Sequence, residues 1–147
     1  MSENNQTKMS NPFIRPVLST EFRIDFDWWK ETDKSWRVFL MGYLCDEHKA
    51  FFSSSANDVL VDSINPDTGA IIQVDQLQDT LINHCARTEN FIQTKGTLTD
   101  SVFRVFLANG NTPLNSEEIG LIINRPAETI LKTLSGPRVY RGIRPIL

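Results

Sequence analysis

Two segments of the chain alternate apolar and polar residues, as β-strands do. In residues 13–29, Phe22, Ile24 and Phe26 alternate with polar residues, which predicts a short strand or an extended arm against a core. Further along, the runs VLVDSI and AIIQV flank NPDTG, whose proline, aspartate and glycine favour a turn. Residues 59–74 therefore predict a β-hairpin, which needs a partner surface for stability.

The segments on either side of this hairpin carry apolar residues at helical spacing. Asp33 is a suitable N-cap, and residues 33–52 predict one long helix. The apolar residues that share one face of this helix are Trp36, Phe39, Leu40, Tyr43, Leu44 and Phe51. Because three further apolar residues lie elsewhere around its axis, we expect it to be covered on more than one side. Residues 75–87 predict a second helix, capped by Asp75.

The last third of the chain predicts three short helices separated by tight turns. Residues 100–110 predict the first helix, residues 115–124 the second and residues 126–136 the third, each with a capping residue or a terminating asparagine or glycine. Two β-prone pieces follow in residues 137–147, on either side of Arg141 and Gly142. They predict a small hairpin at the end of the chain.

Residues 98–147 resemble the winged helix-turn-helix family of DNA-binding domains. Ile119 and Gly120 stand where the family has an apolar and then a small residue, and the small residue lets two helices cross closely. Asn124 occupies the turn position that usually holds a glycine with a left-handed backbone. RPAETI resembles the start of a recognition helix, and YRGIRP resembles a wing hairpin. The resemblance implies a three-helix fold with a wing, which binds DNA or serves as a protein contact.

Length and composition bound the number of domains. A chain of 147 residues with 40% hydrophobic content is long enough for one compact domain or two small lobes. We expect a mainly helical α+β protein with a flexible leader at residues 1–12, an α+β lobe at residues 13–96 and the winged helix-turn-helix domain at residues 97–147. The lobe is expected to contain the long buried helix and the hairpin, and to serve for dimerisation, sensing or docking.

The charge of the chain does not favour nucleic acid as a whole, because the net charge is −3 and the pI is about 5.3. Residues 111–147 carry five basic and three acidic groups, a net of +2, whereas residues 1–110 carry ten basic and fifteen acidic groups, a net of −5. We expect DNA contacts on the outward side of the third helix and on the wing. The expected contact residues are Arg125, Glu128, Thr129, Lys132, Thr133, Arg138, Tyr140, Arg141 and Arg144.

All cysteines and histidines of the chain lie in two short clusters. Cys45 and His48 are three residues apart on a predicted helix, a spacing compatible with zinc. His84 and Cys85 are adjacent, and adjacent side chains on a helix diverge by about 100°. The alternative is that the thiols are small buried groups and the histidines make ordinary hydrogen bonds. We expect no cofactor, and the zinc candidates are these four residues, or three of them with Asp46 or Glu47.

The expected function is non-enzymatic, because the sequence contains no phosphate-binding glycine loop, no nucleophile elbow and no zinc-protease motif. We expect a DNA-binding transcriptional regulator or accessory factor that binds double-stranded DNA and pairs with itself or with another protein through the N-terminal lobe. The alternative is an interaction module of a larger complex, whose winged helix contacts protein. The longest apolar run, VFLMGYLC, is too short to cross a bilayer, so we expect a cytoplasmic protein without a membrane partner.

Overall fold

The computed structural model describes residues 15–53, 59–65, 67–93 and 95–147 as an α+β fold. The leader predicted for residues 1–12 lies outside these ranges. The helices are α2 (Phe26–Thr32), α3 (Trp36–Met41), α4 (Asp46–Ser53), α5 (Gln76–Asn83), α6 (Leu98–Ala108), α7 (Ser116–Ile123) and α8 (Ala127–Leu134), with the short 3-10 helix η1 (Cys85–Arg87). The strands are β1 (Glu21–Ile24), β2 (Leu60–Ile64), β3 (Ile71–Asp75), β4 (Leu114–Asn115) and β5 (Ile143–Pro145).

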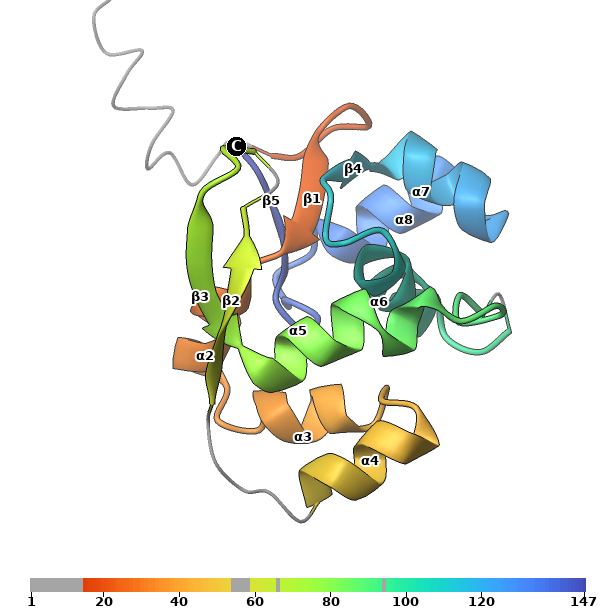
Figure 1. Cartoon of the computed structure of the whole chain (residues 1–147). Helices are drawn as coiled ribbons and strands as arrows, with labels where there is room; N and C mark the ends of the chain where they lie inside the picture. The colour runs from red at the N-terminus through yellow and green to blue at the C-terminus, as the bar shows by residue number, and fades with distance from the viewer. Residues whose placement is uncertain (1–14, 54–58, 66, 94) are drawn as a thin grey trace, which may run out of the picture.

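Strand β1 forms where the alternating pattern predicted it, and it lies at the centre of a three-stranded sheet. It runs antiparallel to β4 on one side and to β5 on the other (Figure 1). Phe22 and Ile24 are buried while Glu21 and Arg23 are exposed, because successive side chains of a strand point to opposite faces. Buried residues from both sides of residue 97 form one hydrophobic core, so β1 packs together with the last third of the chain.

The hairpin predicted within residues 137–147 is wrong. The backbone makes a tight turn at Arg141 and Gly142, both with positive φ, and the Ile143 N–H donates to the Tyr140 carbonyl. The strand after this turn, β5, pairs with β1 and not with the residues just before it. The turn packs closely against α2, because a Cβ at residue 142 would lie 2.9 Å from the Cβ of Trp29. The N-terminal strand thus takes the place of one strand of the expected wing.

The long helix predicted for residues 33–52 is also wrong. The chain forms α3 and α4 there, separated by a turn that begins at Gly42. Asp33 ends α2 instead of starting this helix, since its N–H donates to the carbonyl of Trp29. The interruption shifts the helical phase, so Phe52 is buried in α4 while Phe51, predicted to face the core, is 51% exposed. The periodicity predicted helix correctly but missed the break.

The β2–β3 hairpin and α5 follow the sequence prediction. Val61 is paired with Val74 in the antiparallel register, and the hairpin leads directly into α5 (Figure 1). Asp75 caps α5, as predicted, because its Oδ1 accepts hydrogen bonds from the N–H groups of Leu77 and Gln78. The other carboxylate oxygen lies 2.7 Å from Nη1 of Arg37 at the start of α3. This buried aspartate therefore joins α5 to α3.

Candidate functional site

Helices α7 and α8 form the pair that the sequence singled out, and three local features explain their geometry. Asn115 and Glu118 exchange side-chain and backbone hydrogen bonds in a capping box at the start of α7. Asn124 ends α7 in the left-handed conformation, with φ 57° and ψ 51°. Gly120 allows the two helices to approach, since a Cβ there would lie 2.6 Å from the carbonyl oxygen of Arg125.

Helix α8 buries one side and exposes the other. Ile130 and Leu134 are buried in the core. Thr133, predicted as a base or phosphate contact, is half-buried, and its hydroxyl donates to the carbonyl of Thr129 at 2.9 Å. This hydroxyl is thus already used within the helix. The predicted contact residues that are exposed on α8 and on the turn before it are Arg125, Glu128, Thr129 and Lys132.

Arg141, predicted to bind phosphate, is held inside the fold by other side chains. Its Nη1 donates a hydrogen bond to the hydroxyl of Tyr43 and lies 3.4 Å from Oδ1 of Asp100. Its guanidinium also lies over the rings of Phe39, Tyr43 and Phe103, at 5.3–5.6 Å from their centroids. The guanidinium of Arg141 thus has a carboxylate, a hydroxyl and three aromatic rings as partners within the protein, and it shares the carboxylate of Asp100 with Arg104.

Arg144 and Arg138, the other two arginines predicted for the wing, differ in whether a carboxylate lies next to the guanidinium. The Nη1 of Arg144 lies 3.1 Å from Oδ2 of Asp25, and its guanidinium lies 4.9 Å from the ring centroid of Trp28. Arg138 is exposed, and its guanidinium lies 5.4 Å from the ring centroid of Tyr140. Of the three arginines predicted for the wing, two therefore have a carboxylate partner.

The Arg141 contacts belong to a polar network that the sequence did not reveal. Burial and the hydrogen bond to Asp100 raise the pKa of Tyr43 to about 12. Burial opposes ionisation of Asp100, but hydrogen bonds from Tyr43 and Arg104 outweigh it and lower the pKa of this carboxyl. Arg104 lies four residues after Asp100 on α6, which was the one signal of this network in the sequence.

The two cysteine and histidine clusters of the sequence meet in space. Sγ of Cys45 lies 3.0 Å from Nδ1 of His48 and 3.4 Å from Sγ of Cys85. Sγ of Cys85 lies 3.6 Å from the same Nδ1 of His48. The ring centroids of His48 and His84 are 4.5 Å apart, and the two rings meet edge to face. The structure thus brings the thiol of Cys85, from the second cluster, next to Cys45 and His48, whose spacing in the sequence was compatible with zinc.

The two thiols of this cluster have different environments. The hydrogen bond with His48 lowers the pKa of the Cys45 thiol. Burial raises the pKa of Cys85 to about 11. Both cysteines are free thiols, with Cys45 half-buried and Cys85 buried.

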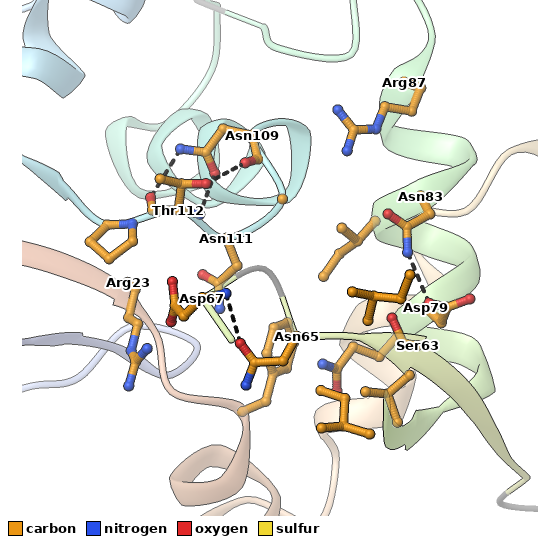
Figure 2. Close-up of a pocket in the computed structure, with 18 residues that line it drawn as sticks. Arg23, Ser63, Asn65, Asp67, Asp79, Asn83, Arg87, Asn109, Asn111 and Thr112 are labelled. Atoms are coloured by element: carbon orange, nitrogen blue, oxygen red, sulfur yellow. Dashed lines mark hydrogen bonds between the residues drawn. The ribbon is translucent and has the colours of Figure 1, made fainter. Parts of the chain in front are cut away.

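A pocket of about 660 Å³, lined by both polar and apolar residues, lies between the β2–β3 hairpin, α5 and the loop that links α6 to β4. Figure 2 shows Arg23 and Arg87 on opposite sides of it, with Asp67 and Asp79 among the other labelled residues. The side-chain Oε1 of Gln78, another lining residue, is buried and finds no hydrogen-bond partner among the described residues. No sequence motif pointed to this pocket, because its residues come from segments that are distant in the chain.

Comparison with known proteins identifies no relative. No protein-family model matches the chain, and neither a curated protein nor a solved structure matches it. Within the part of the chain that the structure describes, no helix is long and apolar enough to cross a membrane.

Proposed function

We propose that the protein binds double-stranded DNA through α8, as a transcriptional regulator or accessory factor. In this proposal, α6, α7 and α8 are the three helices of a winged helix-turn-helix, and β4, β1 and β5 are its sheet. The observation that carries the proposal is the pairing of α7 and α8 across the left-handed turn at Asn124, with a polar row of α8 facing solvent. Helix-turn-helix proteins place such a second helix in the major groove.

The dimensions and side chains of α8 suit this role. An α-helix with its side chains is about 10–12 Å in diameter, which fits the major groove of roughly 12 Å in width. Thr129, Arg125 and Lys132 are exposed. In this proposal Thr129 contacts base edges, and Arg125 and Lys132 neutralise phosphates. Glu128 would repel phosphate unless it accepts a hydrogen bond from a cytosine amino group. In this proposal, the electrostatic attraction to DNA comes from the small basic surface formed by Arg125 and Lys132.

The proposed contact set is narrower than the one predicted from the sequence. Arg125, Thr129, Lys132 and Arg138 are exposed and remain in it. Arg141 is omitted because it is paired with Asp100 and packed against three aromatic rings. In this proposal Arg141 connects segments of the fold and makes no DNA contact.

The test is a fluorescence anisotropy titration of mixed-sequence duplex DNA at low and at moderate salt. We expect binding that weakens steeply with salt, and a slope that falls by about one for each phosphate-binding residue removed. Lys132→Glu and Arg125→Glu should lower the affinity, whereas Lys34→Glu, an equal charge change at an exposed lysine outside this surface, should not. A wild-type chain with no duplex affinity even at low salt would refute the proposal.

A second candidate function is supported by the surface of α7. Leu121 is 85% exposed and Ile122 is 44% exposed, although both are large apolar side chains. Contiguous exposed apolar surface marks contact sites for other proteins, and these two side chains would form part of such a surface. In this case the domain would be an interaction module of a larger complex. The test is association of the chain with a co-purified protein partner at high salt. Association that persists there would favour this function over DNA binding, provided that Leu121→Lys abolishes it and Lys34→Glu does not.

A further inference from the structure

The cysteines and histidines of this chain converge on one point, although they come from two distant segments. The chain has two cysteines and two histidines, and Cys45 and His48 precede His84 and Cys85 by some forty residues. The ligand atoms of Cys45, His48 and Cys85 all lie within 4.8 Å of one another. The ring of His84 lies next to the ring of His48. Soft sulfur and imidazole groups gathered in this way are a ligand set that zinc prefers.

The separations of the ligand atoms fit a tetrahedral metal site. Zinc bonds of about 2.3 Å to sulfur and about 2.0 Å to nitrogen place two sulfurs roughly 3.8 Å apart, and a sulfur and a nitrogen roughly 3.5 Å apart. The two sulfurs of the cluster are 3.4 Å apart, and the two sulfur–nitrogen distances are 3.0 and 3.6 Å. Each separation differs from its tetrahedral value by at most about 0.5 Å.

The local backbone places the side chains for this purpose. Cys45 comes directly before α4, and its carbonyl accepts a hydrogen bond from Lys49 N–H at 2.8 Å, so Cys45 and His48 lie on the same side of the first turn. His84 follows the last residue of α5, with φ −131° and ψ −67°. Because this backbone is not helical, the divergence of adjacent helical side chains does not apply to His84 and Cys85.

We propose that Cys45, His48, Cys85 and His84 form a tetrahedral site for Zn²⁺. The first three supply the ligand atoms that are already close together, and His84 supplies the fourth by a change of rotamer at its exposed side chain. Both thiols bind as thiolates and release their protons to solvent, so two negative charges balance the divalent cation. The resulting Cys₂His₂ site uses only protein ligands, which is typical of structural zinc.

In this proposal, the metal site attaches helix α4 to the rest of the fold. Helix α4 has eight residues, of which Phe52 is the buried one, so little apolar burial attaches this helix to the core. A metal shared by the start of α4 and the junction of α5 and η1 would attach it directly. Binding free energy at such a site adds to folding free energy, because the unfolded chain does not present the ligands together.

Two metal-free states of the cluster would behave differently from a zinc site. In the first, the thiols and His48 are joined by hydrogen bonds alone, at the distances that the structure shows. In the second, Cys45 and Cys85 form a disulfide, which would require the sulfurs to approach to about 2.0 Å. The hydrogen-bonded state leaves two reactive thiols and binds no metal, and the disulfide state leaves no thiol at all.

The direct test is a titration of the full chain, freed of metal under reducing conditions, with Co²⁺ and then Zn²⁺. We expect one Co²⁺ per chain, with the visible bands of a tetrahedral ion and the near-ultraviolet charge-transfer band of thiolate ligands, and displacement of Co²⁺ by Zn²⁺. Zinc should also raise the Tm by mass action. No stoichiometric binding, or binding without a thiolate band, would overturn the proposal.

Variants assign the ligands. Cys45→Ser and His48→Asn should each bind Co²⁺ at least tenfold more weakly, and Cys45→Ser should lose about half of the charge-transfer intensity because one thiolate of the pair remains. Asp46→Asn and Glu47→Gln change neighbouring acidic groups and should leave binding unaltered. His84→Asn should weaken binding at least tenfold and keep the charge-transfer band. Unchanged affinity in this variant would remove His84 from the site.

A measurement on the wild-type chain keeps the proposal testable if the variants unfold. Zn²⁺ should protect Cys45 and Cys85 from a thiol reagent, and removal of zinc by a chelator should restore their reaction. Equal rates with and without zinc would contradict the proposal. An isolated protein whose mass lacks two hydrogens, and which reacts only after reduction, would show a disulfide and contradict it as well.

Discussion

Nη1 of Arg141 lies 3.4 Å from Oδ1 of Asp100, and this ion pair connects the last turn of the chain to helix α6. The same guanidinium donates to the hydroxyl of Tyr43, which in turn donates to Asp100 at 2.5 Å. Three segments that are distant in sequence are therefore joined by one half-buried polar network. An arginine that the sequence assigned to DNA contacts thus acts within the protein.

Arg141→Ala should destabilise the fold by about 1–3 kcal/mol, because it leaves Asp100 and Tyr43 with an incomplete set of partners. The expected loss of unfolding free energy is smaller than for a fully buried ion pair, because the side chains of Arg141 and Asp100 are 30% and 26% exposed. Urea denaturation measures the change. Arg138→Ala, at an exposed arginine, should stay within about 0.5 kcal/mol of the wild type. Equal losses in both variants would contradict a structural role specific to Arg141.

Tyr43 should make the stability of the protein fall at high pH. Its pKa is raised to about 12 in the folded chain, whereas an unfolded tyrosine ionises near pH 10. The stabilisation is thus fully present below about pH 10 and is lost as the pH rises towards about 12. Ultraviolet absorbance of tyrosinate should show one of the two tyrosines titrating late, and Tyr43→Phe should remove this late step. A late step that survives in Tyr43→Phe would refute the assignment.

Gly120→Ala should destabilise the contact between α7 and α8 by about 1–3 kcal/mol. Alanine favours a helix by roughly 1 kcal/mol over glycine, but the added Cβ would meet the backbone carbonyl of Arg125 at 2.6 Å. Gly136→Ala is the matched control, because a Cβ there meets its nearest atom at 3.8 Å. Thermal unfolding of both variants measures the difference. A more stable Gly120→Ala variant would show that the helices can move apart at no cost.

Asn111→Asp should weaken the attachment of β1 to the loop after α6. The Asn111 amide donates to the Ile24 carbonyl and its Oδ1 accepts from the Ile24 N–H, each at 2.8 Å. Aspartate keeps the acceptor but loses the donor and places a negative charge beside the carbonyl, at a cost of about 1–3 kcal/mol. Asn90→Asp is the control, since Asn90 also has a positive φ but is exposed. Denaturant unfolding that does not separate the two variants would count against this role of Asn111.

The elements that the sequence predicted correctly are those decided by neighbouring residues. The hairpin β2–β3 follows from two β-prone runs around a turn, and Asp75 caps α5 through N–H groups two and three residues away. The cap of α7 at Asn115 and the left-handed Asn124 likewise depend on groups within a single helical turn, although the capping box with Glu118 was not predicted. Interactions between residues this close in the chain can be predicted from the sequence alone.

Tertiary structure alone decided the pairing of β1 with β4 and β5, and the break between α3 and α4. The hydrogen-bonding edges of a strand accept any partner strand, and here Phe22 and Ile24 are buried because their face of β1 packs in the core with residues of distant segments, such as Phe103 and Phe106. The ion pair between Arg141 and Asp100 and the cluster of cysteines and histidines also depend on the tertiary structure. Charge and spacing in the sequence do not say that Arg141 meets Asp100, or that Cys45 meets Cys85, because distant segments come together only when the core forms.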